Sequence, residues 1–105
     1  MNVYFTVDTE FHPLNGQWSG QKLLNLFRRD IEGATPEGDF GAFYQSELLR
    51  KHGLKGVFLV EALSGYAAGV ETLQKIVSPL LKAGHEVGLH LHPEWLRRSI
   101  LSESW

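Results

Sequence analysis

Short apolar runs typical of strands alternate along this chain with segments of helical periodicity. The run Val3–Val7 is rich in β-branched and aromatic residues, which predicts a buried strand. Val57–Val60 and Glu86–His92 predict two further strands, the last closed by a proline. Apolar residues at helical spacing predict helices over Phe43–His52 and Val70–Lys82, each followed by a glycine. The predicted order is β–loop–α–β–α–β, which favours an α/β fold with parallel strands and right-handed crossovers.

The connection after the first strand is long and irregular. Residues from Thr9 to about Gly20 include a proline and two glycines and predict a loop, and Leu23–Ile31 has the spacing of a short helix. Glycines and a proline between Gly33 and Gly41 interrupt any regular element there. A long loop directly after a strand is often functional.

The amino-acid composition limits the kinds of protein to which this chain can belong. The 105 residues are enough for one domain or part of one, and 43% are hydrophobic and 21% charged, as in soluble globular proteins. A net charge of −2 without a basic patch argues against a nucleic-acid partner. The absence of cysteine excludes disulfides, thiolate metal sites and cysteine catalysis. No apolar stretch approaches the roughly 20 residues of a membrane span, and no secretory signal follows Met1, so the expected location is cytoplasmic.

Two acidic residues stand where the first strand ends. Asp8 and Glu10 are two positions apart, so on an extended chain both carboxylates face one side. Parallel α/β folds place their ligands at the carboxyl ends of strands. The residues alone also allow a pair of solvated acids that cap a loop.

Two histidines stand in the same way at the end of the third predicted strand. His90 and His92 share one face of an extended chain, and imidazole with carboxylate suits a divalent transition metal. Glu94 could supply another oxygen ligand, or could be the first acid of a helix. His12 lies close enough to Glu10 in sequence to reach such a site, although a solvated loop position suits it better.

Other motifs are few. The chain has no Gly-x-Gly-x-x-Gly after a strand, no phosphate-binding loop of the Walker type and no Gly-x-Ser-x-Gly. Trp18 and Trp95 could stack on pyranose rings, or could serve in packing.

Two segments of the chain resemble a known family. Thr6-Val7-Asp8-Thr9-Glu10, and the run Gly-His-Glu-Val-Gly-Leu-His-Leu-His-Pro-Glu-Trp from Gly84 to Trp95, are similar to the polysaccharide deacetylases. These are the NodB-homology domains of carbohydrate esterase family 4, and the similarity is closest to bacterial members associated with surface-polysaccharide clusters. Leu48–Val60 also resembles the first helix and second strand of the family, whereas residues 13–39 have no match.

The resemblance implies a distorted (β/α) barrel that removes N- or O-acetyl groups from the sugars of a polysaccharide or its precursor. By this analogy Asp8 is the general base, Glu10 the acidic metal ligand and His90 the first histidine ligand. The expected cofactor is a divalent ion, zinc first, with cobalt, manganese, nickel and iron open, and the expected partner is a carbohydrate.

The chain departs from the family pattern in two ways. The usual second histidine falls at Glu94, so the third ligand is either His92 or Glu94. The family domain is also roughly twice as long, and a full (β/α)₈ barrel has about 250 residues. By this resemblance we expect residues 1–105 to correspond to the N-terminal part of one such domain, without the later motifs for an arginine, part of the substrate groove and an acid histidine.

A half-barrel would leave Val57–Val60 and Val87–Leu91 beside open sheet edges, which favours self-association or pairing with a C-terminal half. Two alternatives to the deacetylase follow: a non-catalytic half-barrel that binds a metal or a partner, and a related barrel amidohydrolase acting on a small amide.

Overall fold

A three-stranded parallel sheet organises the part of the chain that the structure describes. The structure is a computed structural model, and residues 3–10 and 20–93 are described. The strands lie in the order β1–β4–β5, with β1 at Phe5–Thr9, β4 at Gly56–Glu61 and β5 at Glu86–His90. Both pairings are parallel, as the sequence predicts.

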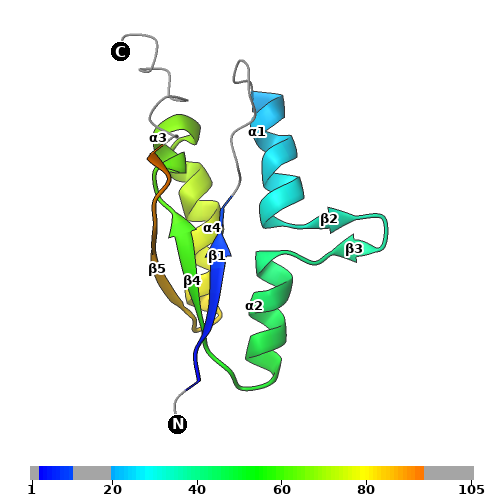
Figure 1. The fold of residues 1–105 in the computed structure, drawn as a ribbon. Helices are drawn as coiled ribbons and strands as arrows, with labels where there is room; N and C mark the ends of the chain where they lie inside the picture. The colour runs from blue at the N-terminus through cyan, green and yellow to red at the C-terminus, as the bar shows by residue number, and fades with distance from the viewer. Residues whose placement is uncertain (1–2, 11–19, 94–105) are drawn as a thin grey trace.

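The connections between these strands are mainly helical (Figure 1). Both long predicted helices are confirmed within a residue or two of their predicted bounds. The short predicted helix also forms, but it changes part-way from α-helical to π-helical hydrogen bonding. The elements are α1 (Gly20–Leu26), the π-helix η1 (Phe27–Ile31), α2 (Ala42–Lys51), α3 (Ser64–Ala68) and α4 (Val70–Lys82).

A small hairpin projects from the junction between η1 and α2 (Figure 1). It pairs β2, Ala34–Thr35, with β3, Gly38–Asp39, where the sequence predicts only irregular structure. Arg28 joins its base by ion pairs at 2.7 Å to Glu32 and 3.0 Å to Asp39. These pairs are solvent-exposed, so the hairpin base depends more on its backbone than on them.

Two glycines make that backbone crossing possible. Gly41 N–H donates to Glu32 O and Phe40 N–H donates to Gly33 O, each at 3.0 Å. A Cβ on Gly41 would lie 2.2 Å from Ile31 O, and one on Gly33 would lie 2.4 Å from Gly41 N. Gly33 also has a φ of 64°, which disfavours other residues. The two glycines, which in the sequence predict only irregular structure, are therefore what permits the two backbone segments to approach closely.

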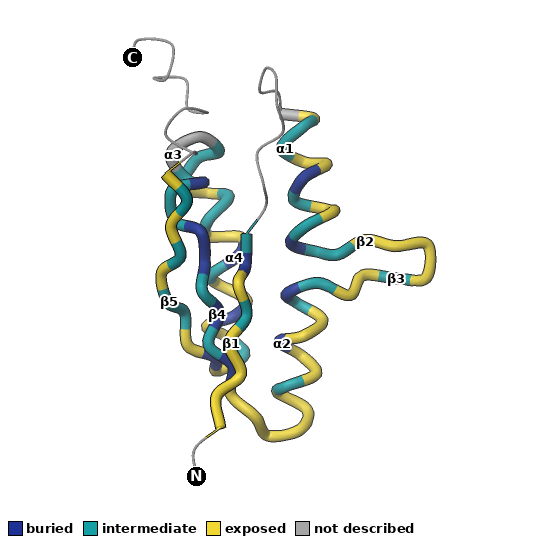
Figure 2. The backbone as a smooth tube through the Cα atoms, in the orientation of Figure 1, coloured by how far each residue is buried: buried dark blue, intermediate teal, exposed yellow. Residues whose placement is uncertain are grey.

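One face of the sheet forms the core. Phe58 and Val60 of the central strand are 0% and 4% exposed and pack in one cluster with Ile76 and Leu80 of α4. The same cluster includes Ile31, so η1 also belongs to the core. Figure 2 shows the burial concentrated on β4 and on the sides of the helices toward the sheet.

The opposite face of the sheet has no helix over it among the described residues. Thr6, Asp8 and Glu86 are exposed on this face, and Val57 and Leu59 between them are half-buried. Parallel sheets are normally covered on both faces.

The expectation about open edges is partly wrong. Residues Val57–Val60 lie in β4, which is paired on both sides and is the central strand. Within the described residues the free edges belong to β1 and β5, where Leu89 and Leu91 are 64% and 50% exposed. The edge expectation holds for the third predicted strand and fails for the second.

His85 joins the sheet to α2 at the end opposite the candidate site. Its ring is 4% exposed and lies 5.2 Å from the ring of Phe58, centroid to centroid. Gly56 N–H donates to Nδ1, and Nε2 contacts Ser46 O, each at 2.9 Å. With Nδ1 accepting, the Nε2 proton is donated to the carbonyl, so one neutral imidazole satisfies two backbone groups.

Replacing His85 by leucine should destabilise the protein without touching the metal candidates. The change leaves the N–H of Gly56 and the carbonyl of Ser46 buried without their partner, at about 1–3 kcal/mol each. Urea denaturation of His85→Leu measures the loss, and the exposed His52→Leu is the matched control. Equal stability of the two variants would show that the bridge contributes nothing.

Candidate metal centre

The carboxyl ends of three neighbouring strands bring acidic and imidazole side chains into one row. Glu61, the last residue of β4, is paired in register with His90, the last residue of β5. The register of β1 with β4 pairs Thr9 with Val60, so the next residue, Glu10, comes opposite Glu61. The row Glu10–Glu61–His90 lies on the open face because it continues the alternation of Asp8 and Leu59.

The side-chain atoms of this row converge with His92. Glu10 Oε2 lies 2.7 Å from His92 Nε2 and 3.2 Å from His90 Nε2, and the two Nε2 atoms are 3.0 Å apart. The imidazole rings meet edge to face, with centroids 4.7 Å apart. The three residues predicted as metal ligands are therefore brought together.

Glu61 is the member of the group that the sequence interpretation missed. It is 1% exposed, and Leu63 N–H donates to its Oε1 at 2.9 Å. The second oxygen, Oε2, is buried without a hydrogen-bond partner among the described residues. Burial raises the pKa of Glu61, and the backbone N–H groups of Leu63 and His92 oppose that rise. The signal was available: Glu61 directly follows a predicted parallel strand, the same position that singled out Asp8.

These residues fit a divalent cation. One ligand atom from each of Glu10, Glu61, His90 and His92 lies within 4.8 Å of the other three. Ligands of one zinc ion at about 2.0–2.2 Å in tetrahedral arrangement lie roughly 3.3–3.6 Å apart, so small movements would suffice. Nitrogen and carboxylate donors suit zinc and its first-row neighbours, and the buried Glu61 Oε2 has no other partner to satisfy it.

Asp8 lies beside this group and outside it. It is exposed on the open face, two residues before Glu10, and is paired in register with Leu59. At about 3.3 Å per residue, its backbone is roughly 7 Å from that of Glu10. Asp8 therefore lies beside any ligand bound at the group, but it is not one of the four residues that converge.

Four further predicted site residues lie outside the described part of the chain. They are His12, Trp18, Glu94 and Trp95. His92 lies in the group, and Glu94 as an alternative ligand stays a prediction.

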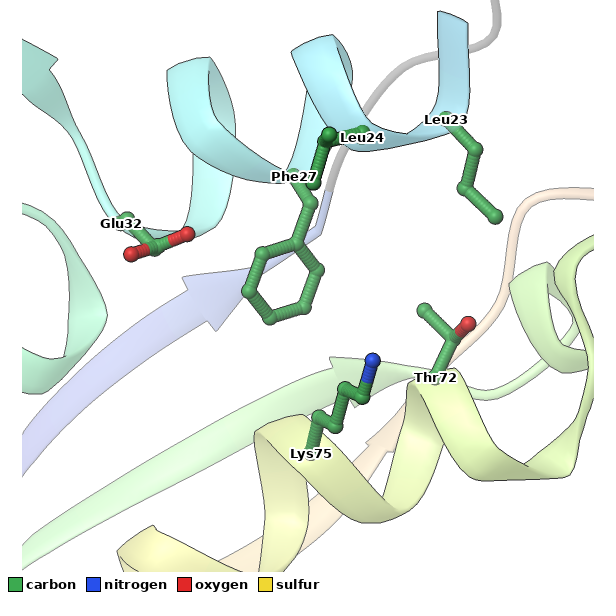
Figure 3. Close-up of a pocket in the computed structure, with 6 residues that line it drawn as sticks. All are labelled: Leu23, Leu24, Phe27, Glu32, Thr72 and Lys75. Atoms are coloured by element: carbon green, nitrogen blue, oxygen red, sulfur yellow. The ribbon is translucent and has the colours of Figure 1, made fainter. Parts of the chain in front are cut away.

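A cavity of about 490 Å³ lies elsewhere, between α1–η1 and α4. Figure 3 shows Phe27 pointing from one side and the ammonium of Lys75 from the other, with Thr72 nearby. The cavity is lined mainly by apolar groups, and it contains none of the four residues of the candidate metal centre.

Comparison of the chain with protein families, with characterised proteins and with solved structures finds no match. Within residues 3–10 and 20–93, no helix has the length and apolar character needed to cross a membrane.

Proposed function

We propose that this chain provides the metal-binding part of a metal-dependent hydrolase that removes acetyl groups from the sugars of a polysaccharide or its precursor. The observation that carries the proposal is the convergence of Glu10, His90 and His92, at 2.7–3.2 Å, from the two edge strands of one parallel sheet. The reaction class comes from the family resemblance of the segments that hold these residues.

The proposed roles divide between holding the ion and moving a proton. Glu10, His90 and His92 would hold the ion; when bound, a divalent ion acidifies water and polarises a carbonyl. Asp8 is the proposed proton acceptor, because it is a carboxylate on the same face that stands beside the group instead of in it. Its exposure leaves it accessible to a substrate that approaches the open face.

The proposed architecture is the first part of a distorted (β/α) barrel. In such a barrel, helices cover the outer face of the parallel strands and the inner face surrounds the axis, with the active site at the carboxyl ends. The described residues have helices over one face only, and the ligand row lies on the other face at the carboxyl ends. The open face would then be the inner face of the barrel.

Acetate release tests the activity. The chain, loaded with Zn²⁺ or Co²⁺, is incubated with N-acetylated and O-acetylated oligosaccharides, with and without a chelator. We expect acetate release that the chelator abolishes, and a loss of about 10²–10⁴-fold in kcat for Asp8→Asn with metal content unchanged. The exposed acid Glu86 gives the matched control Glu86→Gln, which should retain full activity.

A second candidate is a half-barrel that binds metal without turnover. It is favoured by the sheet face that no described helix covers, since the described residues would enclose a substrate held there on only one side. Stoichiometric metal binding with no acetate release from any acetylated sugar would establish this candidate and refute catalysis by this chain. Release of acetate from small amides but not from sugars would instead indicate an amidohydrolase.

A further inference from the structure

The carboxylate of Glu61 is unusual because it is buried and only half satisfied. At 1% exposure it has lost nearly all contact with solvent; Leu63 N–H donates to Oε1 at 2.9 Å, and the backbone of His92 also stabilises the carboxylate. A buried carboxylate without compensation costs several kcal/mol. Within the described residues no donor hydrogen-bonds Oε2, so this oxygen keeps a lone pair that a bound cation would satisfy.

The position of Glu61 is fixed by its backbone. It ends the central strand, and Ser64 Oγ donates to its carbonyl at 2.7 Å. Ala62 N–H donates to His90 O at 3.2 Å, which holds the end of β4 against β5. The carboxylate is therefore held toward the imidazole group by strand pairing and a tight turn, which is the preorganisation expected of a ligand.

Charge indicates what the missing group is. Glu10 and Glu61 bring two carboxylates to one site, where their ligand atoms and those of the two imidazoles lie within 4.8 Å of one another. Two carboxylates this close repel in a partly desolvated site. A divalent cation between them would neutralise both charges and would also bind the imidazole nitrogens of His90 and His92.

We infer that Glu61 is a fourth protein ligand of the divalent ion, in addition to Glu10, His90 and His92. The inference rests on the proposed metal centre. A zinc site with three protein ligands keeps its fourth tetrahedral position for water, whereas four protein ligands fill a tetrahedron. An ion that binds both these four residues and water is therefore five- or six-coordinate, which favours ions of adaptable coordination such as Co²⁺, Mn²⁺ and Fe²⁺ for the working enzyme.

Co²⁺ binding tests this inference because Co²⁺ reports its coordination by colour: four-coordinate ions absorb visible light more strongly than five- or six-coordinate ions. Purified wild-type chain is titrated with Co²⁺ alone. We expect one ion per chain with the weak spectrum of higher coordination. A strong four-coordinate spectrum that Glu61→Gln leaves unchanged would overturn the inference, because the tetrahedron would then be filled without Glu61.

Glu61→Gln then tests the residue directly. This variant preserves the size of the side chain, and circular dichroism establishes its folding. We expect at least about a tenfold weaker affinity for Co²⁺ together with a changed spectrum, since loss of a ligand alters both. Glu86→Gln, an exposed acid on the same face of the sheet, is the matched control and should match the wild type.

The outcomes separate this inference from the proposed metal centre. Weaker binding with an unchanged spectrum would make Glu61 a residue that only positions its neighbours. Unchanged binding in Glu61→Gln, with binding lost in His90→Ala, would overturn the fourth ligand and leave the three-ligand centre intact. Failure of the wild-type chain to bind Co²⁺ would remove both.

Discussion

Replacing His90 and His92 together by alanine should abolish the binding of a divalent ion. The two Nε2 atoms lie 3.0 Å apart, and both are within 3.2 Å of Glu10 Oε2, so the double change removes all the nitrogen donors of the group. Loss of an outer partner of a metal ligand typically costs 10–100-fold in affinity, and loss of two direct ligands should cost more. We expect less than one-tenth of the wild-type metal content after dialysis, measured by elemental analysis.

The control for this experiment is His52→Ala. His52 is exposed at the C-terminal end of α2 and does not belong to the converging group. Its replacement should leave metal content unchanged. Unchanged metal content in the His90→Ala, His92→Ala chain would refute the proposed centre, because the remaining carboxylates would then be sufficient.

Phe58→Ala should cause a large loss of stability because it leaves a cavity in the core. The ring is 0% exposed in the central strand and packs between α4 and the ring of His85. Truncating a buried phenylalanine costs about 3–5 kcal/mol because the surrounding structure collapses only partly into the cavity. Since domains are typically stable by about 5–15 kcal/mol, a large part of the total stability would be lost.

Urea denaturation of Phe58→Ala measures this loss. Phe40→Ala is the matched control, because Phe40 is 47% exposed and contacts mainly Tyr44, edge to face at 5.1 Å between centroids. We expect the control to lose less than about 1.5 kcal/mol. A comparable loss in both variants would mean that the cluster around Phe58 is not the centre of the core.

The strands and the two long helices were predictable because each has one dominant signal. Val70–Lys82 has a helical stripe of apolar residues and a glycine on either side, and its observed bounds agree with the predicted ones. The hairpin between Gly33 and Gly41 was not predictable in this way. Its strands have two residues each and no apolar alternation. Its geometry depends on the close approach of the backbones of Gly33 and Gly41, which lie on either side of the hairpin.

The candidate site was predictable as far as the spacing of residues along a strand shows which way their side chains face. Two residues at alternate positions on a strand face one side, which correctly brought Glu10, His90 and His92 together. Glu61 follows a predicted strand as Asp8 does, but a single acid at that position does not show which side chains it will meet. It became significant only when strand pairing placed it between β1 and β5, and this pairing is a tertiary property.

The convergence of Glu10 with His90 and His92 joins the first strand of the described chain to the last. An ion held there would act as a cross-link that closes a loop containing nearly all of the helices. Such closure removes much of the freedom of the unfolded chain. In the three-stranded sheet of the described residues, the ion would then stabilise the fold as well as take part in the proposed reaction. A chelator would loosen the fold itself, and the folded lifetime of the protein would follow the supply of metal.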